Sequence, residues 1–172
     1  MRLCVAIMSH VKAIPRASMI LSLVATGLFL LSLGSCFLPL LHVDTLAHEG
    51  IEFFGYLVVF GGRTEVALDS GVYSFSFNTN LPLLITFQGL LLSAAACYLG
   101  GRSILNRIFA LVLGLASLIA LCFVKTFVLT TSTLESNGLS FGLGFYLALG
   151  FAIAANICQG LNLYFFWRAK RG

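Results

Sequence analysis

Charged residues are scarce in this chain, and their scarcity argues against a soluble fold. Only 9% of its 172 residues are charged, whereas 59% are hydrophobic. A soluble domain carries about 25% charged and about 45–50% apolar residues. A soluble chain of this size could not bury so much apolar surface, because accessible surface falls too slowly with mass. The composition therefore indicates a single membrane domain over residues 1–172.

The short motifs of catalysis and cofactor binding are also missing. The sequence contains no GxSxG, HExxH or Walker motif, and no acidic residue lies inside an apolar span. Its basic residues form no stripe of the kind that binds nucleic acid. We therefore expect no enzymatic activity, no cofactor and no nucleic-acid partner.

Cysteine motifs are lacking as well. The five cysteines form no CxxC pair and no zinc-finger spacing, and none lies in an outer loop. We therefore expect packing thiols rather than a loop disulfide. Cys36 ends the sequence Leu33-Gly34-Ser35-Cys36, which resembles a bacterial lipobox. The apolar run continues to Leu41 and the charged lead is long, so a retained helix is favoured over a signal peptide or lipidation.

Four long apolar spans make up most of the chain. A helix needs about 20 residues to cross a hydrocarbon core about 30 Å thick. Because each span crosses the bilayer in the direction opposite to the span before it, neighbouring spans are antiparallel, which predicts an all-α transmembrane fold, a four-helix antiparallel bundle. The predicted spans are residues 17–41, 81–100, 104–129 and 139–167.

The distribution of charge predicts the orientation. All six acids fall in the connections 42–80 and 130–138. Eight of the ten bases fall in the N-terminal tail, near the turn between spans two and three, or at the C-terminus. Basic residues are enriched on the cytoplasmic side of a plasma membrane, so both chain ends are expected in the cytoplasm.

The first outer loop, residues 42–80, is the only substantial part outside the bilayer. Residues 72–77 alternate apolar and polar side chains, the period of a half-buried strand. Segments 40–47 and 51–54 flank a plausible turn. We expect a small extracellular β-element of two or three strands that packs on the helix ends or on a partner.

The segment Gly55–Gly62, which reads GYLVVFGG, resembles a G-[FY]-x-[LV]-[IV]-F-G pattern. The pattern is found in small four-span membrane proteins of bacteria, chiefly Gram-positive ones, where it also follows a proline-ended first helix and a strand-rich stretch. The resemblance implies an architecture and a bacterial plasma membrane, with no catalytic residues to transfer. Its candidate interaction or packing residues are Gly55, Tyr56, Phe60 and Gly61.

The layout is also similar to that of claudins, which have four helices, a long strand-forming first outer loop and a short second one. The claudin loop carries a tryptophan and two cysteines, and residues 42–80 contain neither residue type. The similarity therefore concerns topology alone, and a shared topology does not supply a function.

Two polar sets are candidate sites. His42, Asp44 and His48 would share one face of a strand and could approach a Zn²⁺, although a solvated strand face is the favoured interpretation. In span four, polar amides recur every three residues along one side of the helix. They could line a path for an ion or small solute, but hydrogen bonding between helices is favoured. These amides are Asn156, Gln159 and Asn162.

Two functions remain from the sequence. The favoured one is an interaction or structural protein, either an accessory subunit or a self-associating module that presents its outer loop. The alternative is a small oligomeric channel or transporter that uses the polar face of the fourth helix. Both functions require the lipid bilayer, and both allow a protein partner or a homo-oligomer.

Overall fold

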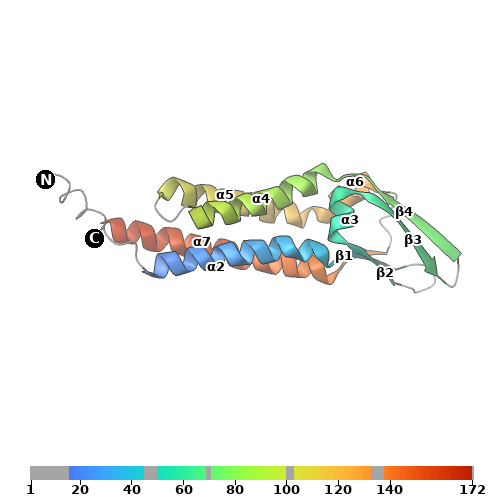
Figure 1. Ribbon diagram of the computed structural model, residues 1–172, viewed down its shortest axis with the longest axis horizontal. Helices are drawn as coiled ribbons and strands as arrows, with labels where there is room; N and C mark the ends of the chain where they lie inside the picture. Colours follow the sequence, from blue (N-terminus) through green and yellow to red (C-terminus); the bar gives the residue numbers. More distant parts are fainter. Residues whose placement is uncertain (1–15, 45–49, 69–70, 100–102, 133–137, 172) are drawn as a thin grey trace, which may run out of the picture.

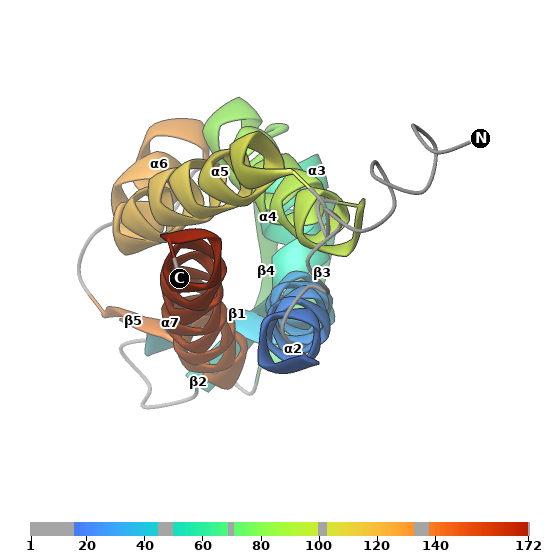
Figure 2. The ribbon, with the colours of Figure 1, turned by 90° about the vertical axis from the view of Figure 1, so that its left-hand side faces the viewer.

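The structure is a computed structural model that describes residues 16–44, 50–68, 71–99, 103–132 and 138–171. Four long helices lie side by side, and the strands gather at one end of them (Figures 1 and 2). In the described part of the chain these four helices are long and apolar enough to cross a membrane. They are α2 (Arg16–Gly34), α4 (Leu81–Leu99), α5 (Ile104–Cys122) and α7 (Leu143–Arg171).

The helices are more polar inside the bundle than outside it. Three serines lie on the buried face of α2, Ser18, Ser22 and Ser32, whereas Met19 and Leu23 are more than half exposed. Helix α5 repeats the pattern, because all of its buried residues except Leu121 are small or polar, namely Arg107, Ala110, Gly114 and Ser117. In water this arrangement would leave a large apolar surface exposed, which is unfavourable, whereas lipid solvates that surface. The small residues inside the bundle let the helices approach closely. The protein is therefore a multi-pass membrane protein.

Three helix boundaries differ from the predicted spans. The predicted span 17–41 is too long, because α2 gives way to a 3₁₀ turn, η1 (Ser35–Phe37), and then to strand β1 (Pro39–Asp44). The predicted span 104–129 is interrupted at Phe123, after which a separate helix, α6 (Val124–Thr131), begins. The predicted span 139–167 begins too early, because Leu139–Phe141 form strand β5 and α7 starts at Leu143. At the first and third of these boundaries, pairing of β1 and β5 with distant strands follows the end of the apolar helix or precedes its start.

The described residues contain five strands in two antiparallel sheets. Strands β1, β2 (Gly50–Phe54) and β5 form one sheet in the order β2-β1-β5. Strands β3 (Gly62–Leu68) and β4 (Gly71–Phe77) form a hairpin that extends beyond the bundle (Figure 1). A short helix, α3 (Gly55–Phe60), joins β2 to β3.

Strand β4 falls where the alternation of residues 72–77 predicts it. Strands β1 and β2 overlap the segments 40–47 and 51–54 that were predicted to flank a turn, although 45–47 lie outside the described residues. Strand β3 was not predicted, and β5 belongs to the second connection rather than to loop 42–80.

An aromatic cluster joins the two sheets. Phe53 on β2 is buried and makes edge contacts with Phe75 and Phe77 on β4, with ring centroids 5.1 Å apart in both pairs. Such edge-to-face pairs are favourable beyond the area that they bury. The alternation along β4 thus turns its phenylalanines toward the other sheet, and the two sheets form one strand module.

The start of α7 packs closely on η1 and β1. A Cβ atom added at Gly144 would lie 2.8 Å from the carbonyl oxygens of Ser35 and Pro39. The backbone N–H of Gly142 donates to the carbonyl of Leu40 over 2.9 Å. Glycine is therefore needed here for close approach between backbones.

Candidate functional site

The amides of α7 face the inside of the bundle. Gln159 and Asn162 are completely buried and Asn156 is 6% exposed. A polar side chain at this depth is costly unless it is hydrogen-bonded. The partners of these three side chains therefore decide what the polar face does.

Arg107 on α5 meets two of these amides. Its Nη1 donates to the Ser18 hydroxyl over 2.8 Å and also to Oδ1 of Asn162. Its guanidinium lies 4.3 Å above the Phe166 ring, a cation–π arrangement. Because Ser18, Arg107 and Asn162 belong to α2, α5 and α7, this contact joins three helices.

Further hydrogen bonds complete the set. Ser18 Oγ donates to Asn162 Oδ1 over 2.6 Å, and Asn162 Nδ2 donates to Gln159 Oε1 over 3.1 Å. Gln159 Nε2 donates in turn to the backbone carbonyl of Arg107 over 3.1 Å. We name Ser18, Arg107, Gln159 and Asn162 the polar cluster. Its groups are directed at one another, an arrangement that binds helices rather than a passing solute.

The sequence did not identify two members of this cluster. Arg107 was counted with the basic residues near a cytoplasmic turn, and Ser18 was part of an apolar span. A signal was present, because Arg107 shares a helix face with Ala110, Gly114 and Ser117, all small or polar. A stripe of that composition in an apolar helix indicates a helix-packing face.

Asn156 lies about 9 Å along α7 from Asn162, by helix rise, and behaves differently. Its Nδ2 donates to the carbonyl of Ala152 in its own helix over 2.8 Å. Its Oδ1 is buried without a hydrogen-bond partner among the described residues. A Cβ added at Gly114 would lie 2.6 Å from that oxygen and 2.7 Å from the Phe29 ring. Asn156 therefore makes a steric contact with α5 rather than a polar one.

The glycines of the GYLVVFGG segment lie at close backbone contacts. Gly55 donates its N–H to the carbonyl of Leu38 over 3.1 Å, and an added Cβ would lie 2.7 Å from the Cys36 oxygen. Gly61 has a φ of 82°, and an added Cβ would lie 2.8 Å from the Thr79 nitrogen. Tyr56 and Phe60, in contrast, are 47% and 60% exposed. The segment thus combines two packing positions with two exposed aromatic side chains.

Asn80 holds the short helices α3 and α6 against the start of α4. It precedes α4 and is completely buried, and its Oδ1 accepts the N–H of Leu83 over 3.1 Å, as a helix N-cap does. Its Nδ2 donates to the carbonyl of Phe127 and to the hydroxyl of Thr131, both over 2.9 Å. Its own N–H donates to the carbonyl of Val59 over 3.0 Å. One side chain and its amide thereby connect α3, α4 and α6.

The proposed metal ligands are only partly described. His42 and Asp44 both lie on β1, whereas His48 lies outside the described residues. The Cα partner of His42 across the sheet is Glu52, and that of Asp44 is Gly50. Within the described ranges, no group of three histidine, cysteine or acidic residues could hold a metal ion.

Comparison of the chain with protein-family models, with curated proteins and with solved structures gives no match to any of them.

Proposed function

We propose that this chain is a non-catalytic interaction protein of a bacterial plasma membrane that presents its strand module outside the cell. In this proposal the four helices form an antiparallel bundle with both chain ends in the cytoplasm. Helix α2 begins and α7 ends at the end of the bundle opposite the strands, which supports the arrangement (Figure 1). The basic residues of the tail, the inner turn and the C-terminus support the orientation.

The observation that carries the proposal is that both outer connections belong to one module. Strand β1 pairs with β2 and with β5, so Leu41 lies opposite both Phe53 and Phe141. An isolated bridge joins Phe77 to Ser132, and Lys125 Nζ donates to the carbonyl of Leu139 over 2.8 Å. Loops joined in this way form a surface of fixed shape, which is what recognition of a partner requires.

The β3–β4 hairpin supplies the contact surface. Apart from the single bridge of Phe77 to Ser132 at the base of β4, its two strands pair only with each other in the described sheets, so most of each outer edge can pair with another strand. Val72 is 71% exposed and Tyr73 41% exposed near the tip. An extended segment of a partner would add to this edge by main-chain hydrogen bonds, with these side chains contributing selectivity.

The polar cluster supports the interaction function over the channel. A conduction path needs polar groups that face a wetted space, whereas these groups hydrogen-bond to one another and to the helices around them. The face of α7 that suggested a channel thus has a sufficient role in holding the bundle together.

The test is purification of the tagged chain from its native host in a gentle detergent, with mass spectrometry of co-purifying proteins. We expect a stoichiometric companion, and Val72→Asp should release it while the chain stays folded. Arg168→Gln, an exposed change at the opposite end of α7, should keep it. The proposal is contradicted if the purified particle contains this chain alone and conducts ions in liposomes, and if Asn156→Leu abolishes that conductance.

A further inference from the structure

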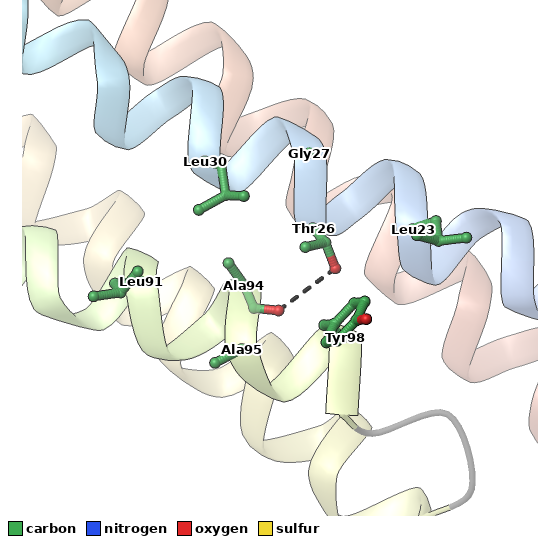
Figure 3. Close-up of a pocket in the computed structure, with 8 residues that line it drawn as sticks. All are labelled: Leu23, Thr26, Gly27, Leu30, Leu91, Ala94, Ala95 and Tyr98. Carbon is green, nitrogen blue, oxygen red and sulfur yellow. Dashed lines mark hydrogen bonds between the residues drawn. The ribbon is translucent and has the colours of Figure 1, made fainter.

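A groove runs between α2 and α4 on the outer surface of the bundle (Figure 3). Its volume is about 470 Å³, and it extends over two turns of each helix. We name it the α2–α4 groove, lined chiefly by Leu23, Gly27, Leu30, Leu91, Ala94 and Tyr98.

The groove offers an occupant almost no polar group. Two of its lining residues carry a hydroxyl, Tyr98 at one end and Thr26 in the middle. The Thr26 hydroxyl donates to the carbonyl of Ser22 over 2.9 Å and points toward the carbonyl of Ala94 at 3.5 Å (Figure 3). Since that hydroxyl is already satisfied within the protein, the occupant of the middle of the groove must be apolar.

The shape of the groove favours a single chain over a helix. Leu23 and Leu30 are 51% and 47% exposed on one side, and Leu91 and Tyr98 are 48% and 69% exposed on the other. These four side chains lie toward the two ends of the groove, with Gly27 between them (Figure 3). A helix of equal length, about 11 Å long and 10 Å wide, would occupy roughly 800 Å³. An acyl chain is thinner and is the abundant apolar chain at this position in a bilayer.

A basic side chain lies beyond one end of the groove. Arg16, at the start of α2, is exposed, and it lies seven residues before Leu23 and eleven before Gly27. At 100° per residue these three positions share one face of the helix, and Arg16 is about 10 Å from Leu23 along the axis. At that distance the Arg16 guanidinium would contact the headgroup of a lipid whose acyl chain lies in the groove. Tyr98 lies at the same end of the groove as Arg16.

We infer that the α2–α4 groove holds one acyl chain of a phospholipid whose anionic headgroup contacts Arg16. The lipid belongs to the leaflet at the end where α2 begins. The groove supplies a shape for the chain, and Arg16 supplies selectivity for a negative charge. The inference does not depend on the partner proposed for the strand module.

Gly27 provides a direct test. A Cβ at this exposed glycine would meet no atom within 4 Å, so Gly27→Leu fills the groove without disturbing the fold. Gly150→Leu is the matched control, because Gly150 is also an exposed helical glycine with open space around its Cβ and does not line the groove. The probes are phosphatidylglycerol and phosphatidylcholine with identical acyl chains, and bound lipid is counted by native mass spectrometry.

We expect the wild-type chain and Gly150→Leu to retain one lipid with a preference for phosphatidylglycerol. Gly27→Leu should weaken lipid retention about tenfold or more. Arg16→Gln should keep the lipid and lose the preference for the anionic headgroup. The inference is overturned if Gly27→Leu retains lipid like the wild type. It is also overturned if the wild type is a lipid-free dimer that Gly27→Leu converts to a monomer, because a second copy would then fill the groove.

Discussion

Arg107 donates a hydrogen bond to the hydroxyl of Ser18 over 2.8 Å, although 89 residues separate them in the chain. The contact joins the third long helix to the first inside a layer of apolar side chains. Asn162 of the fourth long helix accepts from both residues. Three of the four long helices therefore meet at one guanidinium.

The first prediction concerns this meeting point. Asn162→Ala removes the shared acceptor and leaves a buried cation with less compensation, which should cost about 1.5–3 kcal/mol. The measurement is thermal or denaturant unfolding in detergent micelles. Asn156→Ala is the control and should cost clearly less, because the Asn156 oxygen has no described hydrogen-bond partner to lose. Equal costs at the two positions would refute this account of the polar cluster.

The second prediction concerns Asn80. Asn80→Ala removes one helix cap and two hydrogen bonds to α6, so we expect a loss of about 2–4 kcal/mol at about 1 kcal/mol per bond and cap. Hydrogen exchange should become faster in residues 124–131 as well as at the start of α4. Asn78→Ala, two residues earlier at an exposed position, should leave both unchanged. A change confined to α4 would mean that Asn80 serves only as a cap.

The third prediction concerns the contact between Gly114 and Asn156. Gly114→Ala places a methyl group against the Asn156 oxygen and the Phe29 ring, and overpacking of this kind costs about 1–3 kcal/mol. Asn156→Ala in the same chain should recover part of that loss, so the double mutant is more stable than the sum of the single changes implies. Strict additivity in a denaturant titration would show that the two residues do not meet.

The fourth prediction concerns the GYLVVFGG segment. Gly55→Ala forces a methyl group against the backbone of Cys36 and should lower the yield of folded protein, with a cost of about 1–3 kcal/mol. Gly150→Ala is the control, and it should be neutral or stabilising by up to about 1 kcal/mol through helix propensity. Fluorescence-detected size-exclusion chromatography of both variants after heating makes the comparison. If the Gly55→Ala protein is as heat-resistant as the wild type, the backbones of Gly55 and Cys36 are not in close contact.

The fifth prediction concerns the pairing of the two outer connections. Val43 and Leu139 are directly opposite in β1 and β5, so Val43→Cys together with Leu139→Cys should form a disulfide in cells. Formation without added oxidant would require the strands to be on the oxidising side of the membrane. The pair Val43→Cys and Ser140→Cys is out of register and should remain reduced. Non-reducing electrophoresis after alkylation distinguishes the two.

Local pattern was enough to predict part of this fold. Each of the four predicted apolar spans contains a helix long and apolar enough to cross a membrane, and β4 forms where residues 72–77 alternate. Strand β5 has three residues at the edge of an apolar run, and its strand character comes from pairing with β1 far away in the chain. Phe123 interrupts a continuous apolar span for a reason that residue types do not reveal. The β5 boundary was decided by tertiary pairing, which is absent from a local window.

The candidate site was predictable to a similar degree. The spacing of Asn156, Gln159 and Asn162 placed them on one face of a helix, and all three are buried. Arg107 was harder to interpret, since a basic residue four positions into a span is equally typical of an interfacial anchor. Which way it points depends on helix packing. The sequence therefore predicted the buried amides but not Arg107, which bonds to Asn162 and Gln159.

The pairing of β1 with β5 has a consequence for biosynthesis. The hydroxyl of Ser140 donates to the carbonyl of His42, 98 residues away in the chain. Strand β1 leaves the ribosome long before β5, so one edge of β1 has no partner until the connection that carries β5 has been made. A chain arrested before its fourth span would carry that open edge on its surface, where proteases and chaperones recognise unfinished proteins. Closure of the β2-β1-β5 sheet thus requires that the chain has been made as far as the residues just before α7.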